Sequence, residues 1–292
     1  MVAAAKGNER VVKQFLNNSG HSIVDASDRN GWTALTIAAK KGNTQIVSLL
    51  VENGADVNKR GGPLYQAPLR YALMNYDGIA KVNDSAVNIV KLLLEKGANP
   101  NEMAKQTDED ERNMTLLHFT AIFDQVEIMK LLLDKGANIS ARSNYIDDEP
   151  GTKPSVTPLM FAVQNGNENA VKILLEMGAN PNATSKNCMN SFHIAIITNH
   201  TQILKILVES YRSHHLNSKT ISSFPPPGNT LEEDQNRNCT ETNPIMIYAA
   251  VENSTDSLKF LLETGESPNA ISKAKNSTPL IGFAILVYLI FK

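Results

Sequence analysis

Side chains that could carry chemistry are scattered along the chain and are not gathered in a catalytic motif. His118 and His193 recur at one position of a repeated phrase, and neither has a nucleophile and an orienting group at a fixed spacing. The sequence also lacks a glycine-rich loop of the kind that binds phosphate. We therefore expect that the chain is not an enzyme and acts on no small-molecule substrate.

Two groups of polar residues raise the question of a metal site, and the spacing of both argues against one. His214 and His215 lie in a long loop with Cys239 downstream, whereas a zinc site needs more ligands at a firmer spacing. The acidic run 108–111 lacks the alternating ligands and the turn glycine of a calcium-binding loop. We interpret both groups as solvated loop residues and expect neither a metal nor a cofactor.

Composition and charge narrow the class of partner and the compartment. The formal net charge is -2 and the isoelectric point is near 6.3, so no broad positive field attracts nucleic acid or an anionic membrane. Cys188 and Cys239 are too few for a disulfide framework, and we interpret both as reduced thiols. The first residues lack the apolar stretch of about 7 to 15 residues in a secretion signal. These features predict an intracellular, cytoplasmic protein with no nucleic-acid partner.

One phrase of sequence recurs along the chain, and its most complete copy spans residues 31–58. Within it, residues 46–51 are apolar at positions i, i+1, i+3 and i+4, which is one stripe of a helix. Gly54 then permits the left-handed turn that ends a helix. Each copy is therefore predicted to be two short antiparallel helices and a turn. Neighbouring copies must stack because one pair cannot bury its own apolar faces.

The other copies keep the two halves of the phrase in alternation. The openings, such as Thr157-Pro-Leu159 and Thr115-Leu-Leu-His118, resemble the Thr-Pro-Leu-His pattern of the ankyrin family, which has a period of about 33 residues. The resemblance implies an all-α solenoid of stacked helix-turn-helix units with projecting β-turn or hairpin loops. It also implies that His118 and His193 hold the turn through hydrogen bonds. The opening half returns at residues 67–72, 115–120, 157–162, 190–195, 244–249 and in part 278–280, and the closing half at 89–101, 128–140, 170–182 and 257–269.

We expect a single array over residues 1–292, built from units that differ in the length of their turns. The longest insertion, at residues 212–239, contains three consecutive prolines and an acidic run and is expected to be mobile. In that unit Tyr211 replaces the helix-ending glycine. The expected units are 1–30 (partial), 31–64, 65–112, 113–154, 155–187, 188–241 with the loop 212–239, 242–275, and 276–292 (partial).

The carboxyl-terminal run 280–291 is the one stretch whose apolar content could indicate a membrane. Its roughly 12 residues are fewer than the ~20 that a helix needs to span a bilayer. The run begins with the repeat's own Thr-Pro-Leu, so we interpret it as a final first helix whose partner helix is missing. We expect no membrane partner within this chain, and a truncated membrane segment is the alternative.

The resemblance to ankyrin repeats implies that partners bind the tips of the turns and the outer positions of each first helix, which line a concave groove. In this sequence the position before an opening is often apolar, and so is the end of several first helices. We expect a protein or peptide to dock across this stripe, although the insertion loops could instead cover it as a secondary core. The predicted partner-binding residues are Trp32, Lys40, Lys41, Met114, Ile122, Phe123, Val156, Met189 and Ile197.

Two shorter motifs suggest further recognition. The segment from Leu50 to Asn58 resembles the site that asparaginyl hydroxylases modify in ankyrin repeats, which predicts hydroxylation of Asn58. Phe224-Pro-Pro-Pro-Gly228 is similar to the proline-rich ligands of EVH1 domains, although its fifth residue is glycine and a plain disordered loop is the alternative.

The function that these features favour is a non-catalytic protein–protein interaction scaffold. Two alternatives stay open. The chain could be the recognition segment of a larger enzyme, ligase adaptor or ion channel, or it could be a secreted microbial effector that binds host proteins.

Overall fold

A computed structural model describes residues 1–19, 23–73, 83–104, 114–143, 155–185, 188–214, 245–252 and 254–265. Regular structure in these ranges is almost entirely helical, with one two-stranded sheet. The expected all-α fold of stacked helix pairs with projecting hairpin turns is confirmed. The chain divides into two compact parts, Met1–Tyr145 and Ile146–Lys292, and each is described by itself.

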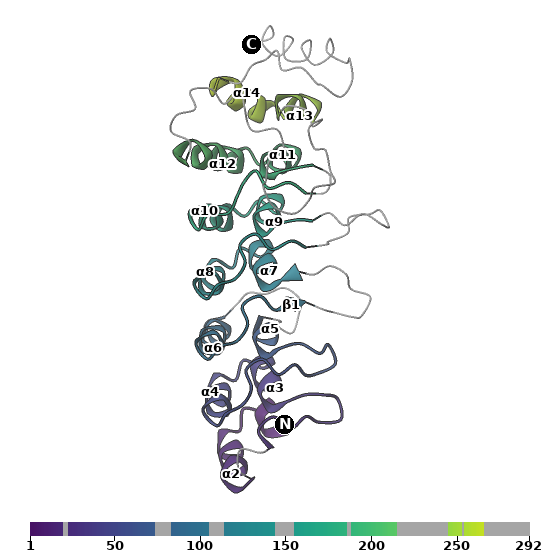
Figure 1. The fold of residues 1–292 in the computed structure, drawn as a ribbon, viewed down its shortest axis with the longest axis vertical. Helices are drawn as coiled ribbons and strands as arrows, with labels where there is room; N and C mark the ends of the chain where they lie inside the picture. The colour runs from purple at the N-terminus through teal and green to yellow at the C-terminus, as the bar shows by residue number, and fades with distance from the viewer. Residues whose placement is uncertain are drawn as a thin grey trace. The chain divides into compact units, whose positions relative to one another are not determined.

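Helix pairs build the amino-terminal part. Its first helices are α1 (Val2–Ala5), α3 (Ala34–Lys40), α5 (Pro68–Leu73) and α7 (Leu116–Ile122), and its second helices are α2 (Glu9–Ser19), α4 (Thr44–Glu52), α6 (Asp84–Glu95) and α8 (Val126–Asp134). The first helices α1, α3 and α5 pack in one row, and the second helices pack in another (Figure 1). Strands β1 (Met103–Ala104) and β2 (Met114–Thr115) form an antiparallel hairpin directly before α7.

The carboxyl-terminal part repeats the same arrangement. Its first helices are α9 (Pro158–Gln164), α11 (Ser191–Ile197) and α13 (Ile245–Val251), and its second helices are α10 (Glu168–Glu176), α12 (Thr201–His214) and α14 (Thr255–Glu263). Within this part, α11 packs between α9 and α13, and α12 packs between α10 and α14 (Figure 1). Each helix pair therefore buries its apolar faces mainly against its neighbours.

Side-chain caps begin the first helices. At α3 the Thr33 hydroxyl accepts a hydrogen bond from the Thr36 amide at 3.1 Å, and the Thr33 amide donates to the Thr36 hydroxyl at 3.0 Å. This reciprocal box satisfies amides that the first turn of a helix leaves unpaired. Thr157 caps α9 ahead of Pro158, whose fixed φ suits the first helical turn and which has no N–H to satisfy.

The two histidines of the repeated phrase take part in the same caps. At α7 the Thr115 amide donates to Nδ1 of His118 at 3.1 Å, and at α11 the Asn190 amide donates to Nδ1 of His193 at 3.4 Å. Asn190 Oδ1 in turn accepts from the His193 amide at 3.2 Å. Both histidines are buried. The expectation that they hold the turn through hydrogen bonds is confirmed.

Glycine ends most of the second helices, and its replacement lengthens one of them. Gly54 follows α4 with φ +85°, and the Ala55 amide returns to the Leu50 carbonyl at 3.0 Å, which closes the helix. Tyr211 takes this position in α12, which continues to His214. As a result α12 has 14 residues, whereas α4, α8, α10 and α14 have 9 each.

The additional turn of α12 is packed on both sides. The Tyr211 ring meets Phe192 edge-on, with 6.2 Å between ring centroids. Burial raises the pKa of the Tyr211 hydroxyl. The Arg212 guanidinium donates to the Thr264 carbonyl at the end of α14, with its Nη2 at 3.1 Å. These contacts stabilise the additional turn of α12, which stands where the other second helices end in a glycine turn.

A ladder of asparagine side chains joins consecutive turns of the amino-terminal part. The Asn58 side-chain amide donates to the Gly97 carbonyl at 3.0 Å, and its Oδ1 accepts a hydrogen bond from the Asn99 backbone amide at 2.8 Å. Asn101 repeats this arrangement: its side-chain amide donates to the Gly136 carbonyl at 3.1 Å, and its Oδ1 accepts from the Asn138 backbone amide at 2.7 Å. Each asparagine thereby satisfies backbone groups that a helix end would otherwise leave to water.

Asn182 holds the same position in the carboxyl-terminal part without the same partners. The next second helix is α12, in which Tyr211 replaces the glycine and the helix continues. Asn182 Oδ1 is buried and accepts no hydrogen bond from the part of the chain that the structure describes. The ladder therefore depends on the helix-ending glycine of the following unit.

Because the ladder depends on the helix-ending glycine, alanine substitutions of Asn101 and Asn182 should change the free energy of unfolding by different amounts. Asn101→Ala removes two hydrogen bonds between units and should lower the free energy of unfolding by about 1–2 kcal/mol. Asn182→Ala removes an acceptor that is already unsatisfied and should change it by less than about 0.5 kcal/mol. Urea denaturation followed by circular dichroism measures both, and equal losses would show that the ladder does not stabilise the stack.

Candidate functional site

Trp32 is the first of the predicted partner-binding residues along the chain, and it packs against the adjacent turn. Its ring packs at 47° against Tyr71, with 4.8 Å between centroids. Gly62, at φ +72°, lies so close that a β-carbon there would be 2.8 Å from Cζ3 of Trp32. The Tyr71 hydroxyl donates to the Gly61 carbonyl at 2.9 Å, and burial raises its pKa, which keeps it protonated as a donor. Trp32 is therefore half-buried and fixed in orientation.

Lys40 covers the other side of this aromatic pair. Its Nζ lies 4.9 Å from the Trp32 ring centroid and 5.8 Å from that of Tyr71, within the range of cation–π attraction. Lys41, the next residue, is exposed at the end of α3. The two predicted lysines thus differ in burial, because Lys40 is half-buried over the rings and Lys41 is exposed.

The predicted apolar residues of the amino-terminal part divide into exposed and buried ones. Phe123 follows α7 and exposes 43% of its surface, and Ile122 is half-buried beside it. Met114 exposes only 4%, so the prediction that it lies on an open groove surface is wrong. Its backbone belongs to β2, which pairs with β1 directly before the α7 cap.

The remaining predicted residues lie in the carboxyl-terminal part. Ile197 ends α11 and exposes 39% of its surface, whereas Val156 and Met189 are half-buried ahead of α9 and α11. The predicted apolar stripe therefore consists of one group of residues in the amino-terminal part and another in the carboxyl-terminal part. No observation tests whether either group contacts a partner, so their binding role stays a prediction.

Two exposed residues on the turns were missed by sequence reasoning. Tyr65 exposes 68% of its surface in the turn 61–66, where its own backbone has φ +45°, and Met103 is exposed on β1. Both lie outside the repeated phrase, so the register of the repeat assigns them no position. An aromatic residue within a loop that contains consecutive glycines was the available signal.

An ion pair holds two of the projecting turns together. The Arg60 guanidinium lies 3.1 Å from a carboxylate oxygen of Glu102, and Glu102 is buried although it is acidic. Arg60 adjoins the turn that carries Tyr65, and Glu102 adjoins Met103. The opposite charges of this pair link the bases of the two turns, although Oε1 of Glu102 accepts no hydrogen bond within the described residues.

Asn58 is exposed, as a modification site requires, and its side-chain amide is hydrogen-bonded to the neighbouring unit at both the nitrogen and the oxygen. Hydroxylation of Asn58 stays a prediction.

Cys188 corrects an expectation from the sequence. It is disulfide-bonded, so the interpretation of both cysteines as reduced thiols is wrong. It lies at φ +58° in the turn before α11, and its amide donates to the Ser185 carbonyl at 3.0 Å. Because disulfides persist mainly in oxidising compartments, the cysteines no longer support an intracellular location.

Several motifs named from the sequence lie outside the described residues, namely Cys239, His215, the acidic run 108–111, the proline motif 224–228 and the apolar run 280–291. Among the helices that the structure does describe, none is both long and apolar enough to cross a membrane. The same ranges contain no group of three or more His, Cys, Asp or Glu residues placed to hold a metal ion.

The single tryptophan provides a direct reading of the Trp32 cluster. Lys40→Ala removes the aliphatic stem and the ammonium group above the ring, so Trp32 emission should shift to longer wavelength and its quenching by acrylamide should increase. Lys41→Ala is the matched control and should leave both unchanged. Indistinguishable emission and quenching from the wild type and Lys40→Ala would contradict the packing described above.

Comparisons with known proteins place this geometry in a family. The sequence matches the family described as ankyrin repeats, in three copies, over residues 1–103, 66–143 and 144–220. An ankyrin repeat domain from Acinetobacter baumannii has a similar crystal structure, with a TM-score of 0.59 and 24% identity, covering 72% of this chain and 96% of that one.

Curated relatives are much longer than this chain. It is 26% identical to the human ankyrin and armadillo repeat-containing protein over 71% of this chain and 13% of the relative. It is 31% identical to human transient receptor potential cation channel subfamily A member 1 over 38% of this chain and 8% of the channel. It is 25% identical to palmitoyltransferase AKR1 of Lachancea kluyveri over 72% of this chain and 26% of that protein.

Proposed function

The chain belongs to the ankyrin-repeat family, and we propose that it is a non-catalytic scaffold that holds a partner protein or peptide against its projecting turns and first-helix ends. The observation that carries this proposal is the exposure of Tyr65, Met103 and Phe123 on these elements of the amino-terminal part. We call these three residues the turn surface. Large apolar side chains at exposed turns and helix ends favour contact with another molecule.

The turn surface is supported by a rigid base, which favours binding because less conformational entropy is lost. In the turn that carries Tyr65, the Gly61 amide donates to the Gln66 carbonyl at 3.0 Å, and the Tyr65 amide donates to the Gly62 carbonyl at 3.0 Å. Trp32 packs against Gly62 from the neighbouring turn. The Arg60–Glu102 ion pair joins this turn to the one that carries Met103.

The chemistry of these residues favours a peptide segment with apolar anchors. Tyr65 and Phe123 offer ring faces, and Met103 offers a flexible thioether that adapts to different side chains. Lys40 and Lys41, at the end of α3, would favour acidic residues beside the anchors. We infer an extended or helical partner segment with apolar residues at intervals and a negative charge at one end.

A second candidate is that this scaffold is the recognition segment of a larger protein. The observation that favours it is the coverage of the relatives, because the chain spans 13%, 8% and 26% of three of them, including a cation channel and a palmitoyltransferase. Any channel or transferase activity would then lie in sequence outside this chain.

The test is a triple substitution of the turn surface, Tyr65→Ser, Met103→Ser and Phe123→Ser. Partners captured from a lysate of the native cells are quantified by mass spectrometry for the wild type and the variant. Capture of a true partner should fall by about tenfold or more, because interface anchors each contribute on the order of 1–2 kcal/mol. The melting temperature should be nearly unchanged because all three side chains are exposed.

The control is a double substitution of exposed apolar residues away from the turns, Phe15→Ser on α2 and Met177→Ser after α10. It should leave capture intact. A captured set that is the same in kind and amount for the wild type and the triple variant would contradict the proposal, and so would an equal loss in the control.

A further inference from the structure

The replacement of glycine by Tyr211 has a consequence on the second-helix face of the carboxyl-terminal part. Helix α10 ends at Glu176 and is followed by Gly178 at φ +93°, whereas α12 continues beside it to His214. The last turn of α12 therefore projects past the end of α10, and the two helices do not close against each other there. A groove of about 380 Å³ lies between them.

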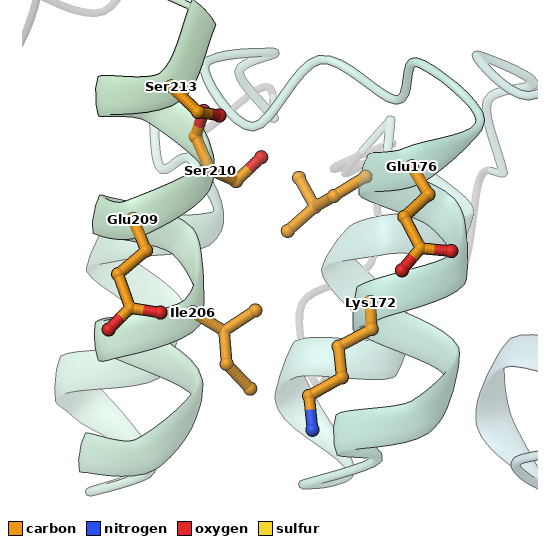
Figure 2. Close-up of a pocket in the computed structure, with 7 residues that line it drawn as sticks. Lys172, Glu176, Ile206, Glu209, Ser210 and Ser213 are labelled. Atoms are coloured by element: carbon orange, nitrogen blue, oxygen red, sulfur yellow. The ribbon is translucent and has the colours of Figure 1, made fainter.

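The groove has an apolar floor and polar walls that come from both helices. Leu175 is buried and Ile206 is half-buried, and together they form the apolar floor. Lys172 and Glu176 on α10 and Glu209, Ser210 and Ser213 on α12 line the sides of the groove, and Figure 2 shows Ile206 pointing into the space between the two helices. Both walls thus present polar groups over an apolar base.

The charge of the groove is negative at the end where α10 stops. Glu176 and Glu209 are exposed, and neither forms an ion pair with any residue in the described ranges. Both helices also direct their carboxyl ends toward this region, and helix carboxyl ends carry partial negative charge that favours cations. Lys172 lies one helical turn earlier on α10, on the same helix face as Glu176, so its positive charge offsets part of the negative charge and leaves the groove with one net negative charge.

We propose that this groove is a second docking site, which takes an arginine side chain from a basic segment of a partner protein. The methylene stem would lie on Leu175 and Ile206, and the guanidinium group would reach the carboxylates of Glu176 and Glu209 and the serine hydroxyl oxygens. Arginine suits this site better than lysine because its planar fork of donors reaches acceptors on two walls at once.

This site does not depend on the proposed function at the turns. It lies on second helices of the carboxyl-terminal part, and the turn surface lies on turns and a first helix of the amino-terminal part. A scaffold with both would hold an apolar partner segment at one place and a basic segment at another.

The experiment uses the full chain and two peptide libraries with randomised flanks, one with a fixed central arginine and one with citrulline, its neutral counterpart, in the same place. Wild-type protein should bind members of the arginine library, and binding should weaken with added salt. Glu176→Gln with Glu209→Gln should reduce affinity for these peptides by about tenfold or more, since hydrogen bonds to charged groups are lost.

Glu252→Gln with Glu263→Gln is the matched control, because it makes the same change in net charge at exposed positions of the same part. It should alter affinity by less than about twofold. Equal binding of the arginine and citrulline libraries would overturn the proposal, as would equal losses in the two double variants or no binding of the arginine library. None of these results bears on the triple variant of the turn surface, so the two proposals fail independently.

Discussion

The stacking of apolar helix faces on neighbouring pairs is the interaction on which the rest of this structure depends. A pair such as α3 and α4 is too small to bury Leu35, Ile46 and Leu50 by itself, and these residues are buried because the adjacent pairs cover them. Stacking requires that each helix begin and end at a set place. The threonine and histidine caps and the glycine stops provide those places, and they leave the turns free to project and carry Tyr65 and Met103.

One departure from this regularity accounts for several features at once. With Tyr211 in place of glycine, α12 extends beyond α10, packs its new ring on Phe192 and opens a groove beside Glu176. The same change leaves Asn182 Oδ1 without the partners that Asn58 and Asn101 have within the described chain. Because Tyr211 does not end α12, the asparagine link between units is missing at this place and a groove lies open beside the helix.

The sequence predicts the helices and their ends well because caps and stops act locally, on the backbone of the residues that supply them, as Thr33 and Gly54 do. It predicts the exposure of the candidate surface residues less well because exposure is set by contacts outside the repeated phrase. Met114, on strand β2, is buried, and Tyr65 is exposed in a turn that the repeat does not specify. The disulfide of Cys188 is likewise not predicted, because sequence spacing alone does not reveal which cysteines are bonded.

The central claim is that the turns and first-helix ends of the amino-terminal part hold the partner. Hydrogen–deuterium exchange of the full chain, measured with and without the captured partner, tests this most directly. We predict slower amide exchange on binding in the turn 61–66, at β1 and at the end of α7, with little change in α4 and α8. Protection confined to the second helices, or none at the turns, would contradict it.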